Sequence, residues 1–154
     1  MRGTIICGCL AAAALLNAAP AARASDDSIR QVVRTQATRQ IKEDNRFGKA
    51  LQHLKTRKGL KKASAAAGRQ GASVKIWHNA LAAETADTPQ VAQGQKEMLD
   101  ALDLYTKGLR RFQKAVRQAL HSGGSSGYSK AKAAGRNMRT AAKRVGKAAE
   151  KIAG

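Results

Sequence analysis

One stretch, residues 88–121, constrains the fold more than any other, because a helix start, a long apolar repeat and a helix stop all meet in it. Thr88 and Pro89 form the pattern of an N-cap followed by proline at the first helical position, where its missing N–H costs no hydrogen bond. Residues then recur at alternating steps of four and three, with one polar member: Val91, Gln95, Met98, Leu102, Tyr105, Leu109, Phe112, Val116 and Leu120. This spacing places them on one side of a helix. The run Ser122-Gly123-Gly124 is expected to end it.

Two more apolar stripes precede this helix. The first predicts a helix over about 26–56, with Ser25 as its cap and Gly59 ending it after a turn over 55–59. The second predicts a helix from Leu60 to about residue 85 that contains Gly68 and Gly71, each of which costs ~1 kcal/mol relative to alanine in a helix interior. These glycines mark either a close approach of two helices or the loosest part of the molecule.

The last segment is a cationic amphipathic helix. A Gly/Ser linker over 122–127 precedes it, and the helix is expected over 128–154. Its apolar stripe consists largely of small residues: Tyr128, Ala131, Gly135, Met138, Ala142, Val145, Ala149 and Ile152.

Four helical segments with short connections predict an all-α fold, an antiparallel four-helix bundle in up-down-up-down order. The alternative is a three-helix core over 25–121 with the last helix loosely docked, because a small apolar face buries little area. The stripes also have coiled-coil-like spacing, so pairing with a second copy of the chain stays open as a route to a homo-oligomer.

The first 24 residues read as a cleavable signal peptide. Arg2 supplies the positive start, residues 5–16 the apolar run, and Ala22-Arg23-Ala24 a cleavage pattern before Ser25. An uncleaved membrane anchor and a lipoprotein signal at residues 6–9 are the alternatives. Cys7 and Cys9 both lie in this segment, so its removal leaves a mature chain that cannot form a disulfide. Because of the signal peptide, we expect the mature chain in the periplasm, the cell envelope or the extracellular space.

Positive charge dominates the composition, with 29 Lys and Arg against 10 Asp and Glu and a formal net charge of +19. In the predicted bundle, four helix ends share one strongly positive pole, while Asp26, Asp27, Glu84, Asp87, Glu97 and Glu150 fall toward the other end. The candidate polyanion-binding residues are the basic residues of that pole and of the last helix: Lys55, Arg57, Lys58, Lys61, Lys62, Lys107, Arg110, Arg111, Lys114, Arg117, Lys130, Lys132, Arg136, Arg139, Lys143 and Arg144.

Such a surface favours an anionic polymer or an anionic membrane surface, with nucleic acid as a non-specific partner. The plain alternative is that the charge only keeps an exported helical protein soluble. Two further alternatives are a membrane-surface-active protein that uses its last helix and a basic envelope chaperone.

No pattern in the sequence indicates an enzyme, a metal or another cofactor. His53, His78 and His121 lack metal-ligand spacing, and no haem attachment motif occurs. We expect the Glu43-Asp44 pair to form surface ion pairs with neighbouring basic residues. Trp77 and Tyr105 are expected in the core.

Overall fold

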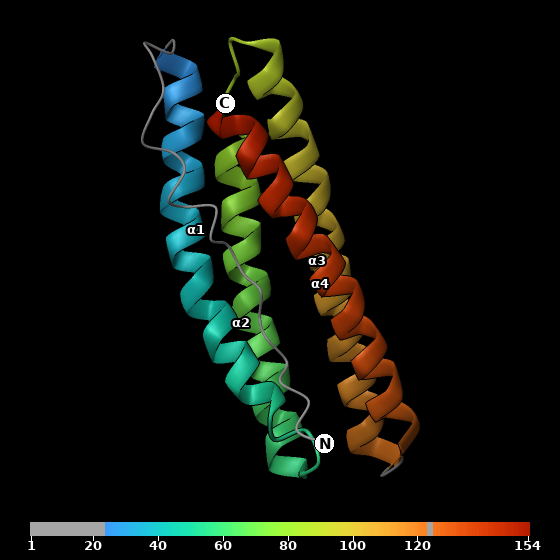
Figure 1. The fold of residues 1–154 in the computed structure, drawn as a ribbon. Helices are drawn as coiled ribbons and strands as arrows, with labels where there is room; N and C mark the ends of the chain where they lie inside the picture. Colours follow the sequence, from blue (N-terminus) through green and yellow to red (C-terminus); the bar gives the residue numbers. More distant parts are fainter. Residues whose placement is uncertain (1–23, 123–124) are drawn as a thin grey trace.

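The computed structural model describes residues 24–122 and 125–154. This part of the chain contains four helices and no strand: α1 (Ala24–Leu51), α2 (Arg57–Ala82), α3 (Pro89–Ser122) and α4 (Ser125–Ala153) (Figure 1). The all-helical prediction is therefore confirmed. Apart from Ala24, the predicted signal segment lies outside the described residues.

Helix α3 begins and ends within one residue of the predicted bounds of 88 and 121. The Val91 N–H donates to the Thr88 hydroxyl oxygen at 3.4 Å, and the Ala92 N–H donates to the Thr88 carbonyl at 2.9 Å. Thr88 thus caps the helix, and Pro89 occupies its first position.

The connection between α1 and α2 differs from the prediction. Helix α1 ends at Leu51, and α2 already begins at Arg57 with Thr56 as its N-cap. Gly59 lies in the first turn of α2, where its N–H donates to the Thr56 hydroxyl at 3.0 Å. A Cβ at Gly59 would overlap the carbonyl oxygen of His53. The glycine is therefore explained by close backbone contact, and its predicted role as a helix end is wrong.

Helices α3 and α4 form the most extensive helix pair, and they lie side by side in Figure 1. Small buried residues recur at every seventh position of α3 along this contact: Gly94, Ala101, Gly108 and Ala115. A Cβ at Gly94 would lie 2.8 Å from Ile152 Cγ1 and 3.2 Å from its backbone nitrogen. The predicted alternative of a loosely docked last helix is contradicted, because small residues let the two backbones approach closely. Helix α4 also begins at Ser125, inside the predicted linker.

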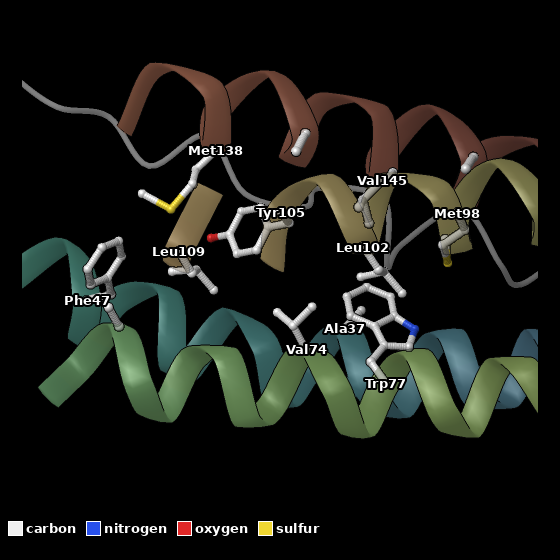
Figure 2. Packing of buried hydrophobic residues seen from close by; sticks show 14 of the residues in the cluster. Ala37, Phe47, Val74, Trp77, Met98, Leu102, Tyr105, Leu109, Met138 and Val145 are labelled. Atoms are coloured by element: carbon white, nitrogen blue, oxygen red, sulfur yellow. The ribbon is translucent and has the colours of Figure 1, made fainter. Parts of the chain in front are cut away.

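Trp77 of α2 and Leu102 of α3 lie in the core together with Met98 and Val145, as Figure 2 shows. At the other end of this core, Phe47 of α1 and the ring of Phe112 meet edge to face, with centroids 5.2 Å apart. Much of the remaining core is alanine, which buries less apolar area per residue than leucine. The core therefore extends along the helices but buries little apolar area at each level.

Helix α2 packs against both α1 and α3, whereas α1 and α4 touch little. One contact between them is the Arg30 Nε–H, which donates to the Ile152 carbonyl at 3.0 Å. This packing is consistent with the up-down-up-down order. Of the helices described, none combines the length and the apolar composition that a membrane span requires.

Candidate polyanion-binding surface

A buried polar layer crosses the middle of the molecule. The Tyr105 hydroxyl and the Gln40 amide each donate to the Asp44 carboxylate, at 3.1 and 3.0 Å, and the Gln70 amide donates to it as well. Asp44 is only 3% exposed. The prediction of a surface ion pair is therefore wrong for Asp44, although Glu43 does pair with Arg46. The hydrogen-bond partners of Asp44 come from three helices.

This layer divides the chain into two parts of very different charge. We call residues 45–69 and 106–137 the basic half and the remaining residues from 25 onward the mixed half. The basic half contains sixteen Lys and Arg and no Asp or Glu, whereas the mixed half contains eleven Lys and Arg and ten Asp and Glu. Figure 1 shows the α1–α2 connection, the end of α3 and the start of α4 at the same end of the molecule, within the basic half. Nearly the whole net charge lies on one side of the polar layer.

The cations of the basic half whose side chains the structure describes are exposed and almost entirely unpaired. Every Lys and Arg side chain described there is exposed, and only Arg46 takes part in an ion pair. Unpaired cations on one surface raise the local concentration of anions, because their fields add. The surface can therefore attract a polyanion without first breaking internal ion pairs.

The predicted residues do not all belong to this half. The structure brings together the α1–α2 group, the α3 group and the first residues of α4, while Arg139, Lys143 and Arg144 lie on the exposed face of α4 outside the residues that define the basic half. The side chain of Lys132 is outside the described part. Three exposed cations of the basic half are absent from the predicted set: Arg46, Lys49 and Arg69. The lack of any acidic residue between Asp44 and Glu84 is the sequence signal that points to them.

Two acidic groups of the mixed half, Asp26 and Glu97, have specific hydrogen-bond partners. Asp26 accepts hydrogen bonds from the Asp87 N–H and the Thr88 hydroxyl, both at 2.8 Å. Burial by itself raises the pKa of Asp26, but the hydrogen bonds from Thr88 and Asp87 outweigh it, so the pKa is lowered. Lys151 donates to the Glu97 carboxylate at 2.6 Å and lowers its pKa too. These carboxylates tie the helix ends together at the end opposite to the basic half.

A groove of about 470 Å³ runs between α2 and α3. A Cβ at Gly68 would lie 3.3 Å from the Gln113 side-chain nitrogen, and one at Gly71 would lie 3.8 Å from a Leu109 methyl group. Neither glycine approaches the backbone of α3, so the expectation of a close helix approach does not hold here. The missing side chains leave the groove open.

Histidine and acidic side chains do not assemble a metal centre in the part of the chain that the structure describes. His78 lies 3.7 Å from the Asp103 carboxylate at one end of the groove, while His53 and His121 are exposed in the basic half. Trp77 and Tyr105 are buried as predicted.

Comparison of the chain with known protein families, curated proteins and solved structures finds no match. A function is therefore inferred from the charge and shape of the basic half and the groove beside it.

Proposed function

We propose that this protein is an exported, non-enzymatic, antiparallel four-helix bundle that binds an anionic polymer through its basic half. The observation that carries the proposal is the separation of charge: sixteen cations without a single acid on one side of the polar layer, and near balance on the other. Solubility alone needs a net charge but no such separation. A one-sided field, by contrast, steers and holds a polyanion.

A membrane-surface role through α4 receives less support. Met138, Val145 and Ile152 of this helix are buried, whereas Tyr128, a predicted member of the same apolar stripe, is exposed near the start of α4. To insert the buried side chains into a bilayer, α4 would have to leave its contact with α3, and the small residues of its apolar face would return little apolar area in exchange. The outer face of α4 carries cations and can contact anionic lipid head groups without undocking.

The test measures binding of the purified protein to heparin, duplex DNA and anionic vesicles over a salt series. One variant replaces the five cations of the α1–α2 connection by glutamine: Lys55, Arg57, Lys58, Lys61 and Lys62. A matched control variant replaces five exposed cations of the mixed half: Arg34, Arg39, Lys42, Lys96 and Lys147. Both variants lose the same formal charge.

We expect the first variant to lose far more affinity for the polyanions than the control variant loses. The affinity of the first variant should also depend less on salt, because each phosphate that is no longer neutralised reduces the steepness of log K against log salt by about 0.9 on duplex DNA. Equal losses in the two variants mean that only net charge matters, and they overturn the proposed surface. Vesicle binding without polymer binding replaces the anionic polymer by a membrane as the partner.

A further inference from the structure

The α2–α3 groove is continuous with the basic half. On α2, the residues Lys61, Gly68 and Lys75 follow one another at seven-residue intervals, and on α3 the residues Arg110 and Arg117 do the same. Residues seven apart lie on the same side of a helix, so both rows follow the groove. Gly68, Lys75 and Arg110 line the groove itself.

The charges of the groove select an anion. Lys75 and Arg110 are exposed and take part in no ion pair within the described residues. The only acid in the lining, Asp103, lies at the end far from the basic half, beside His78. An anionic chain that enters from the basic half therefore passes cations first and meets a carboxylate only where the groove ends.

The two glycines that line the groove lower the stability of helix α2. Glycine within a helix is less favourable than alanine by ~1 kcal/mol, and α2 carries two of them along the groove, at 68 and 71. The backbone of α3 does not require them, since a Cβ at Gly71 would make an ordinary contact with Leu109 and one at Gly68 would press only on the end of the Gln113 side chain, 3.3 Å away. Because they lack side chains, the two glycines leave the α2–α3 groove accessible to an extended polymer chain.

The shape and the lining favour a chain of bare anionic groups. No Phe, Trp or Tyr side chain lines the groove, and its one imidazole, His78, lies beside Asp103 at the end far from the basic half, so the groove offers no row of rings on which successive bases could stack. The guanidinium of Arg110 and the ammonium of Lys75 match phosphate oxygens. From Lys61 to Lys75 the row is about 21 Å long at 1.5 Å per residue, which is long enough for several phosphate groups.

We propose that the α2–α3 groove binds a single linear chain of phosphate groups that enters from the basic half and ends at Asp103. This inference rests on the proposed function and names the kind of polyanion that this groove accepts. Duplex DNA, being too wide to enter the groove, contacts the outer cations only.

The test compares inorganic polyphosphate with duplex DNA. In the Gly68→Leu variant a branched side chain narrows the groove without any change in charge, and its Cβ faces the flexible end of Gln113. The matched control is Ala65→Leu, because Ala65 is exposed on the same helix and does not line the groove. Circular dichroism checks that both variants stay helical.

We expect Gly68→Leu to weaken polyphosphate binding by about tenfold or more, as for the removal of one charge-assisted hydrogen bond, and to leave duplex DNA binding unchanged. Lys75→Gln combined with Arg110→Gln lowers the salt slope for polyphosphate by about 0.7 for each phosphate that is no longer neutralised. Asp103→Asn strengthens polyphosphate binding, because it removes the carboxylate at the end of the path.

Three results overturn the inference. If Gly68→Leu binds polyphosphate as tightly as wild type while the five-cation variant of the α1–α2 connection does not, the groove is not the site, and the proposed function stands without it. If Gly68→Leu weakens polyphosphate and duplex DNA equally, the groove does not discriminate a single chain. Absence of polyphosphate binding by the wild-type protein rejects the inference, and absence of duplex DNA, heparin and vesicle binding rejects the proposed function as well.

Discussion

Replacing Gly94 by alanine tests whether small residues control the contact between α3 and α4. A methyl group on Gly94 would lie 2.8 Å from Ile152 Cγ1, 3.2 Å from the Ile152 nitrogen and 3.3 Å from the Ala148 carbonyl oxygen. Two of these three atoms belong to the backbone of α4, and a branched side chain supplies the third. Relief therefore requires a shift of the helix as a whole.

The magnitude follows from two opposing effects. Alanine is favoured over glycine in a helix by ~1 kcal/mol, while overpacking a close contact costs about 1–3 kcal/mol. Since backbone atoms take up the clash, we expect the steric cost to win, with a net loss of about 1 kcal/mol in the free energy of unfolding. For a chain of this size this lowers the melting temperature by roughly 4 °C.

Thermal melts followed by far-UV circular dichroism measure the effect, and the chain supplies its own controls. Gly146 lies in α4 with no atom within 4 Å of an added Cβ, so Gly146→Ala is expected to raise the melting temperature by a few degrees. Gly108→Ala should fall between the two, because the nearest atom at 2.5 Å belongs to the flexible side chain of Met138. A Gly94→Ala variant as stable as Gly146→Ala would refute this reasoning.

Three further predictions concern charge and the buried layer. The pKa of the Asp26 carboxyl is lowered in the folded state, so the stability that Asp26 contributes is present above the unfolded pKa of ~3.9 and is lost as the pH falls through the folded pKa. Asp26→Asn should therefore lower the free energy of unfolding by about 1–3 kcal/mol at neutral pH. It should also make the free energy of unfolding depend less on pH in the acid range. Tyr105→Phe removes a hydroxyl that donates to the buried Asp44 and should cost about 1–3 kcal/mol in urea unfolding, whereas no loss would mean that other donors suffice. The melting temperature should rise between 0.01 and 0.15 M salt, since the Debye length falls from about 30 to about 8 Å and screens repulsion within the basic half; a fall would contradict this source of instability.

Local signals make the helices predictable. The bounds of α3 follow from the sequence because Thr88 and Pro89 act within one turn and because its apolar repeat is long. The connection between α1 and α2 is harder to place, since Gly59 resembles a helix stop although the cap is Thr56. A glycine required by contact with His53 and a glycine that ends a helix look alike in sequence.

Long-range contacts are not predictable in the same way. Asp44 sits between basic residues in sequence, which favours a surface ion pair, yet its partner Tyr105 is 61 residues away and buries it. The close contact of α3 with α4 cannot be predicted from the sequence for a different reason. Gly94 and Gly108 carry no apolar side chain, so a repeat of such residues is hard to tell from a loose helix until the facing helix is known.

The sequence predicts that one end of the molecule is positively charged, but it does not predict where this basic surface ends. The basic pole follows from the antiparallel order and the positions of the Lys and Arg residues, whereas its boundary at the Asp44 layer requires the structure. The acid-free run after Asp44 already points to Arg46, Lys49 and Arg69, but it extends to Glu84, and the level of the layer on α2 is what ends the basic half at residue 69.

The energetics of the basic half bear on the choice between a binding surface and simple solubility. Sixteen cations crowded on one side of a thin, alanine-rich core repel one another, and this repulsion opposes the packing of α3 on α4. Spreading the same cations over both halves would keep the net charge and its benefit for solubility while lowering the repulsion. On the proposed function, a polyanion that binds the folded arrangement more tightly than the unfolded chain would reverse the sign of this effect, because it would neutralise the cations and stabilise the bundle by mass action. The separation of charge therefore opposes the stability of the free protein, and under the proposed function it would favour the complex with the polyanion.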